Sequence, residues 1–494
     1  MTPATPSASA RVWALLLGSS LLHFFTINEA DNDLWGHVLF GRDILAAGAI
    51  PRVDTYSYTA AGRPWVDHEW LAQVAMASAY AHAGSAGLLW LKLAAAVATC
   101  VLLLAMIRRR TAVPEIWGGL GMLTIAVLAR GFAIRPQIFT YCGVALTLWL
   151  IDRSQRQRPL ALWAFPAVFL VWANVHGGFA LGLAILGLFV AAECLRTRAL
   201  AVQPLLVLSA STAVTALNPY GMTLLAYIWS ELSRPHPITE WQPVAVADVS
   251  HLVFFAMAGL FVVTLPFFRG WRTHGWQPVL ALITGVLALR SQRHTPVFAL
   301  CAVTPLAAQL DEALRWFTRR STFTLSAVSR RVIAVALVGV VTLQLALTGL
   351  RWQRDGWQIV FDPGEYPVAA VRALRRAGVH ANLVVPLDWG ESVLWHLTPN
   401  VKVSLDGRFA TVFPDDVVYM NLGFFTGATG WRRLLDDYPT DAALVPAGSL
   451  SPILRQSNWE RVYSDRVAEV YVRTDRAAAM QLTYEPGGST VFFP

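Results

Sequence analysis

Apolar segments long enough to cross a membrane recur along the first 350 residues, and this repetition constrains the fold more than any other feature. A helix needs about 20 largely apolar residues to span a bilayer. Hydrophobic residues make up 55% of the chain and charged residues only 14%, whereas about 25% of the residues of a soluble domain are charged. We therefore expect a polytopic α-helical membrane protein with about eleven transmembrane helices, near residues 11–28, 86–107, 113–130, 137–151, 160–175, 178–195, 202–217, 249–268, 276–290, 295–311 and 332–350.

The Lys and Arg residues of the short loops predict the orientation, because cytoplasmic loops are enriched in them. With a cytoplasmic N-terminus, the inner loops are all basic: Arg108 to Arg110, residues 153–158, Arg196 with Arg198, residues 269–274 and residues 315–331. An odd number of spans then places residues 351–494 outside. Polar residues, and no small-residue cleavage site, follow the first apolar run, so we expect a retained span there and no cleaved signal peptide.

The chain divides by composition into two parts. Residues 1–350 form the expected transmembrane domain, with a long first outer loop at 29–85, and residues 351–494 form an extracytoplasmic domain. In this second part a helix is expected at 365–377, and short β-branched runs predict strands at 383–385, 401–405, 442–446, 461–464 and 468–473. The net charge of +8 is explained by inner-loop arginines near anionic lipid headgroups. It does not indicate nucleic-acid binding.

Mixed acidic and basic residues gather on the predicted outer face. The first outer loop, where residues 36–47 and 68–82 are expected as interfacial helices, carries Asp31, Asp33, His37, Asp67, His68 and Glu69. Later outer helix ends carry Arg135, Asn174, His176, Arg290, Arg293 and His294. Ionisable groups at membrane depth are costly unless they are paired or functional. We therefore expect these side chains to share one extracytoplasmic cavity.

This set of side chains suits glycosyl transfer from a lipid-linked sugar. Guanidinium groups bind phosphate in a bidentate fork, so Arg135, Arg290, Arg293 and His294 are predicted to bind the donor phosphate. The acceptor needs a general base, for which Asp31 and Asp33 are the candidates. His37, Asp67, His68, Glu69, Asn174 and His176 are predicted to line the cavity. The competing interpretation for Asn174 and His176 is turn chemistry next to Gly177 and Gly178.

A divalent metal is the second possibility for the acidic pair. Carboxylate oxygens are the ligands that Mg²⁺ and Mn²⁺ prefer, so Asp31 and Asp33 are candidate ligands. An Asp-x-Asp pair alone is a weak signal, because acidic pairs are common in loops.

The chain resembles the GT-C superfamily of membrane glycosyltransferases. The resemblance covers most of residues 11–310 and is carried by the segments DNDLWGHVLFGRDI, PRVDTYSYT, WVDHEWL, RPQIFT, WANVHGGF and NPYG. It implies a bacterial inner-membrane enzyme related to protein O-mannosyltransferases. Such an enzyme uses a polyprenyl-phosphate-linked sugar on the extracytoplasmic face and inverts the anomeric carbon. Asp31 or Asp33 would act as the base, with Asp31 preferred because it lies nearer the end of the first span, and the acceptor would be a protein, a glycan or a lipid.

A second likeness lies in the C-terminal part. Asp388, Trp389 and Gly390 are similar to the Asp-Tyr-Gly portion of the Trp-Trp-Asp-Tyr-Gly motif of oligosaccharyltransferase catalytic subunits. The likeness implies an acceptor-binding role for Asp388 and Trp389. The preceding tryptophan pair is replaced by Pro386 and Leu387, which argues against peptide-sequon recognition. An ordinary strand–turn–helix is the competing interpretation.

Two other classes of protein remain open. A transporter or flippase of a lipid-linked or anionic substrate also places charged residues in its spans, usually near the bilayer midplane. A non-catalytic membrane assembly protein would use the outer domain to bind a partner. Replacing Asp31 and Asp33 by Asn separates these readings, because only the enzyme would lose transfer while folding normally.

Overall fold

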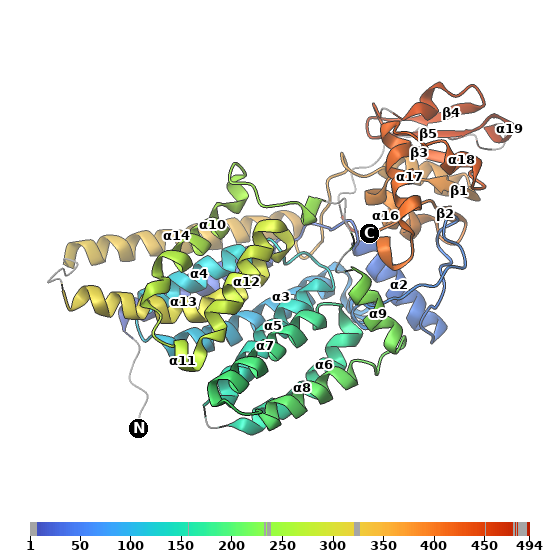
Figure 1. The fold of residues 1–494 in the computed structure, drawn as a ribbon. Coiled ribbons are helices and arrows are strands. Elements are labelled where there is room, and N and C mark those ends of the chain that lie inside the picture. Colours follow the sequence, from blue (N-terminus) through green and yellow to red (C-terminus); the bar gives the residue numbers. More distant parts are fainter. Residues whose placement is uncertain are drawn as a thin grey trace. The chain divides into compact units, whose positions relative to one another are not determined.

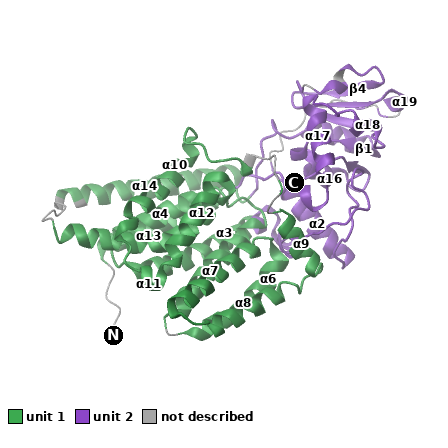
Figure 2. Cartoon of the chain, viewed as in Figure 1, with its two compact units in different colours: residues 1–27, 89–357 green, residues 28–88, 358–494 purple. Residues whose placement is uncertain are grey.

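The computed structural model describes residues 7–494 except 157, 232–233, 235–238, 321–326, 450, 478–479, 481 and 483–491. Contacts divide the chain into two units (Figure 2), unit 1 with residues 1–27 and 89–357 and unit 2 with residues 28–88 and 358–494. The long first outer loop is thus grouped by its contacts with the C-terminal residues. Part of the predicted inner loop 315–331 lies outside the described residues.

Unit 1 is helical (Figure 1). Its longer helices are α1 (Ala8–Phe25), the C-terminal part of α3 (Trp70–Arg110), α4 (Pro114–Ala129), α5 (Gln137–Ser154), α6 (Phe165–Val175), α7 (Phe179–Thr197), α8 (Val202–Val214), α9 (Met222–Glu231), α10 (Leu252–Thr264), α12 (Trp276–Arg290), α13 (Thr295–Thr318) and α14 (Ala327–Asp355). Short helical turns are η1 (Pro159–Ala164), η2 (Thr239–Trp241), η3 (Val249–His251), η4 (Leu265–Phe267), α11 (Trp271–His274) and η5 (Gln292–His294).

Six helices among the described residues are long and apolar enough to cross a membrane, and four shorter apolar helices accompany them. The expected count of eleven spans is therefore not confirmed, because several predicted spans fold as helices of only 13 to 16 residues. Helix α13 is central: 78% of its most apolar window is buried, against 11% for the window in α14. Helix α14 therefore presents most of its apolar surface outward.

Small and polar residues bring α1 close to its neighbours. A Cβ on Gly118 of α4 would lie 2.4 Å from the Trp13 ring of α1, so only glycine permits this approach. On the α14 side, the Ser19 hydroxyl donates to Gln344 Oε1 at 2.7 Å. Small residues and interhelical hydrogen bonds are the usual basis of helix association in lipid.

Helix α3 is two helices joined at a break. Ala83 and Gly84 leave helical geometry, and Gly84 has φ +57°, a conformation that glycine adopts without strain. The unit boundary follows shortly after this break. The segment before it starts at Trp70, and with α2 (Leu34–Ala47) it supplies the two helices expected in the first outer loop.

Unit 2 contains the small sheet expected near the C-terminus. Its strands are β1 (Ala381–Val384), β2 (Val401–Val403), β3 (Ala442–Pro446), β4 (Trp459–Ser464) and β5 (Ala468–Arg473), in the order β2-β1-β3-β5-β4. Strand β1 runs parallel to β2 and β3, and β5 runs antiparallel to β3 and β4. The helices of this part are α15 (Val368–Arg376), α16 (Leu387–Leu397), α17 (Asp415–Thr426), α18 (Arg433–Asp436) and α19 (Thr474–Ala477), with turns η6 (Phe409–Thr411) and η7 (Pro452–Arg455).

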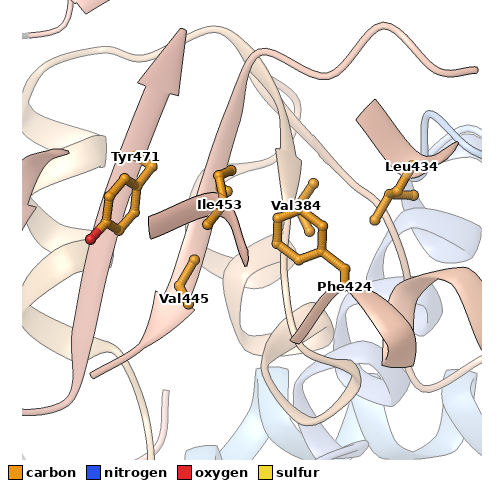
Figure 3. Packing of buried hydrophobic residues seen from close by; sticks show 7 residues of the cluster. Val384, Phe424, Leu434, Val445, Ile453 and Tyr471 are labelled. Carbon is orange, nitrogen blue, oxygen red and sulfur yellow. The ribbon is translucent and has the colours of Figure 1, made fainter. Parts of the chain in front are cut away.

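The core of the sheet domain lies where strands meet α17 and α18. Figure 3 shows Val384, Val445 and Tyr471 of the strands packed with Phe424 and Leu434.

Main-chain pairing ties residues 28–88 to this domain. Ser57 pairs with Val403 of β2 in parallel, and Glu29 pairs with Val360. The Thr59 hydroxyl also donates to the Ser404 carbonyl at 2.6 Å. These pairings explain why residues 28–88 and 358–494 form one unit.

Candidate functional site

The acidic pair of the first outer loop forms the turn that starts α2. Asp33 is the N-cap residue of this helix, but its side chain makes no capping hydrogen bond. Its backbone N–H donates to Asp31 Oδ1 at 3.1 Å, and the Leu34 N–H donates to the Asp31 carbonyl at 3.0 Å. Asp31 therefore shapes the turn, and the Asp33 carboxylate is not used to cap its own helix.

Glu391 of α16 takes the capping position in place of Asp33. Its Oε2 accepts the Gly36 N–H of the first turn of α2 at 3.0 Å. A Cβ on Gly407 would lie 2.4 Å from Asp33 Oδ1 and 2.7 Å from Glu391 Oε1, so both carboxyl groups approach the same glycine. Burial, followed by the charges of Asp33 and Asp406, raises the pKa of Glu391 well above its usual value. Burial and these two charges thus favour the protonated form of Glu391.

Arg408 is buried and forms ion pairs with two carboxylates, those of Asp406 and Asp54. It donates to both oxygens of Asp406, at 2.8 and 2.7 Å, and Nη1 lies 2.6 Å from Asp54 Oδ1. Burial alone would lower the pKa of Arg408, but Asp406 and Asp54 raise it, so the guanidinium stays charged. Four aromatic rings surround it within 6 Å of their centroids: Phe40, Tyr56, Trp65 and Phe413.

A second acidic group lies just before α3. Asp67 is 2% exposed; its Oδ1 accepts from Gln73 Nε2 at 2.9 Å, and its Oδ2 has no hydrogen-bond partner among the described residues. Burial and the charge of Glu69 raise the pKa of Asp67 to about 8. Glu69 itself lies 3.8 Å from His37 Nδ1 and 3.7 Å from His68 Nε2. The structure thus brings four of the predicted residues together: His37, Asp67, His68 and Glu69.

The segment similar to the oligosaccharyltransferase motif lies near the acidic turn. Trp389 is buried, and its Nε1 donates to the Glu365 carbonyl at 2.7 Å. Asp388 is exposed. Burial raises the pKa of Tyr366, and Asp31 and Asp388 add to this rise, so both carboxylates act on the same phenol. Asp388 is therefore the member of this segment that a ligand can reach.

The predicted phosphate-binding residues lie in unit 1. Arg135 Nη1 donates to Glu240 Oε1 at 2.6 Å, and Arg293 Nη1 lies 3.8 Å from the other oxygen of this carboxylate. The Arg293 guanidinium also lies 5.3 Å from the centroid of the Trp241 ring, which the His294 ring approaches edge-on.

Arg290 stands apart from this group at the C-terminal end of α12, where its side chain is exposed. The structure therefore joins Arg135 and Arg293 through a glutamate, with His294 nearby, and leaves Arg290 on the surface of unit 1.

Asn174 and His176 shape the connection between α6 and α7. Asn174 Nδ2 donates to the Leu170 carbonyl at 2.8 Å and to the Leu217 carbonyl at 3.2 Å. His176 Nδ1 accepts the Gly178 N–H at 2.9 Å and lies 2.8 Å from the Thr140 hydroxyl. These contacts suit the turn interpretation of both residues.

The two groups of predicted residues belong to different units, with Asp31, Asp33, His37 and residues 67–69 in unit 2 and the arginines with Asn174 and His176 in unit 1. The predicted meeting of all these side chains in one cavity stays a prediction. Within the described ranges, no group of three or more His, Cys, Asp or Glu residues has an arrangement that could hold a metal ion.

Sequence reasoning missed Glu391, Asp406, Arg408 and Asp54. Two of the contacts join distant parts of the sequence: Glu391 is 355 residues from Gly36, and Asp54 pairs with Arg408. The one local signal is Asp406-Gly407-Arg408, in which a glycine separates opposite charges.

Comparisons with known proteins identify the fold. No family model matches the chain, and no curated protein matches it in sequence. Two crystal structures of ArnT from Cupriavidus metallidurans are similar to it at 13% sequence identity. The apo structure has a TM-score of 0.55, over 97% of this chain and 100% of ArnT. The structure bound to undecaprenyl phosphate has a TM-score of 0.50, over 95% and 99%. The chain therefore has the fold of ArnT along nearly its whole length.

Proposed function

We propose that this chain is a multi-pass membrane glycosyltransferase that uses a polyprenyl-phosphate-linked sugar, with Asp33 as the general base. The single observation that carries the proposal is the fold shared with ArnT, a GT-C glycosyltransferase, over nearly the full length of both chains. One of the similar structures holds undecaprenyl phosphate, which supports a lipid of this class as the donor's carrier.

The position of Asp33 supports its role. It lies between α1 and α2, outside the six candidate spans, and it is half-buried. Transporter sites, by contrast, usually lie near the bilayer midplane. Glu391 caps α2 instead of Asp33, and Asp31 is used in the turn. Asp33 is therefore a better candidate for the base than Asp31.

The proposed reaction is a single displacement. The Asp33 carboxylate takes the proton of the acceptor hydroxyl, and the acceptor oxygen forms a bond to the anomeric carbon from the face opposite the phosphate. The bond between the anomeric carbon and the phosphate oxygen breaks, and the polyprenyl phosphate leaves with the electron pair. The anomeric carbon is inverted. A charged leaving group needs stabilisation by fixed cations, a role we assign to Arg135 and Arg293.

Removing the gene from its host tests the proposal directly. We expect a polyprenyl-linked sugar to accumulate in the membranes, where mass analysis of extracted lipids identifies its sugar and carrier. The wild-type gene and Asp31→Asn should clear this pool. Asp33→Asn should clear it about 10²–10⁴-fold more slowly, because the base is lost.

Asp475→Asn is a matched control, because Asp475 is exposed on α19 of the same unit. Unchanged lipid-linked sugars in the deletion strain would refute the enzyme class. Normal clearance by Asp33→Asn, with the variant present at wild-type level, would refute the assignment of the base.

A further inference from the structure

Two carboxyl groups lie at the start of helix α2, and the one that caps the helix does not belong to the N-cap residue. Asp is among the preferred N-cap residues because its side chain accepts a hydrogen bond from the N–H groups of the first turn. Here Asp33 occupies the N-cap position without making that bond. Glu391, from α16, accepts the Gly36 N–H instead, at 3.0 Å. The first turn of α2 is thus capped by a residue 355 positions away.

Three glycines make this arrangement possible. A Cβ on Gly36 would lie 2.1 Å from the Glu391 carboxyl carbon, and one on Gly407 would lie 2.4 Å from Asp33 Oδ1. A Cβ on Gly390, next to Glu391, would lie 2.3 Å from the Leu405 carbonyl, so the N-terminal turn of α16 packs directly on the 404–408 turn. The site for Glu391 is built by close backbone approach from α2, α16 and that turn.

We propose that Glu391 is a positioning residue for Asp33: it caps α2 in place of the Asp33 side chain and thereby directs the Asp33 carboxylate toward the reacting acceptor. This inference rests on the proposed function, and it assigns to the C-terminal domain a direct part in the active site. Glu391 is 2% exposed, so it acts through Asp33 and does not itself touch the substrate.

The charged and polar groups that face Glu391 shift its pKa. Asp33 faces it from the start of α2, Asp406 and Arg408 face it from the turn after β2, and the Gly36 N–H points at it. Burial and the two aspartates raise the pKa of Glu391 well above its usual value. The protonated form of Glu391 is thus favoured over the charged form, which lowers the repulsion between Glu391 and Asp33.

Two replacements of Glu391 distinguish a role in positioning Asp33 from a role in folding alone. In Glu391→Gln the amide oxygen still accepts the Gly36 N–H, but the side chain no longer ionises. In Glu391→Leu the cap is lost while the side chain stays similar in size. Glu460→Gln is the control, because Glu460 is exposed on β4. The donor is the polyprenyl-linked pool extracted from deletion-strain membranes, and its consumption by purified full-length protein in liposomes is followed against pH.

We expect Glu391→Leu to lower kcat about 100-fold with little change in KM, since small misplacements of a catalytic group have effects of this size. Glu391→Gln should keep nearly the wild-type rate where Glu391 is protonated, because the amide oxygen still accepts the Gly36 N–H, and it should not show the fall in rate that ionisation of Glu391 causes in the wild type. Hydrogen exchange of residues 34–37 needs no substrate: Glu391→Leu should speed it, and Glu391→Gln should not.

Each possible result supports or overturns the positioning role of Glu391. Wild-type rate and exchange in Glu391→Leu would overturn the inference, and so would an equal loss of rate in Glu391→Gln. If Glu391→Leu does not fold, the rate and pH profile of Glu391→Gln decide alone. Failure of the wild type to consume any extracted pool would refute the proposed function, while the exchange data would still show whether Glu391 caps α2.

Discussion

Replacing Arg408 by Met should loosen unit 2 far more than replacing an exposed arginine that has an ion pair of similar length. The Arg408 side chain is 3% exposed, and its partners Asp54 and Asp406 are completely buried. Removing one partner of a buried ion pair costs about 3–5 kcal/mol, because the remaining charge has no counter-ion. The lost contacts with aromatic rings add about 0.5–2 kcal/mol, part of which Met recovers by packing. We therefore expect a loss of about 4 kcal/mol.

Arg461→Met is the matched control. Arg461 Nη1 lies 2.8 Å from Glu469, a distance similar to those around Arg408, but the Arg461 side chain is 54% exposed. Exposed pairs contribute about 0–1 kcal/mol. The comparison isolates burial as the cause of the difference.

Hydrogen exchange of the full-length protein in detergent measures this effect locally. A loss of about 4 kcal/mol corresponds to roughly 10³-fold faster exchange, expected in residues 52–66 and 404–413 of Arg408→Met. Adding Asp54→Asn should recover part of the loss by removing one orphaned charge. Exchange in Arg408→Met no faster than in Arg461→Met would refute the reasoning, and so would a double variant no more protected than the single one.

Three further predictions follow from the same contacts. Asp67 keeps its proton up to a pH of about 8 in the folded chain but releases it near pH 3.8 in the unfolded chain. The free energy of unfolding therefore falls as the pH rises from about 3.8 to about 8. Asp67→Asn should make this fall smaller, as measured by thermal unfolding midpoints across the same pH range. Gly407→Ala should reduce transfer at least about tenfold with little change in unfolding, because its Cβ displaces the Asp33 carboxylate; unchanged turnover would show that this close approach has no role. Glu240→Gln removes a carboxylate that competes with phosphate for Arg135 and Arg293. A titration should show binding of undecaprenyl phosphate about two- to fivefold tighter than in the wild type. Weaker binding would mean that Glu240 orients the two arginines.

The sequence alone determined the features that depend on neighbouring residues. Apolar runs predicted helices along the first 350 residues, and short β-branched runs predicted the strands that became β3 and β5 with the same bounds. Part of the acidic turn at Asp31 and Asp33 is also local, because the Asp33 and Leu34 N–H groups both donate to Asp31. The count of eleven spans is not confirmed, because several of the predicted spans form apolar helices shorter than 18 residues.

Only the tertiary structure determined which carboxyl group caps α2 at the acidic turn. Whether Asp33 caps α2 depends on a competing acceptor, and that acceptor, Glu391, is brought to Gly36 by the packing of α16 on α2. The pairing of Arg408 with Asp54 depends likewise on the first outer loop joining the sheet at Ser57. Charges and caps are set by through-space neighbours, and neighbours hundreds of residues apart leave no periodicity in a sequence.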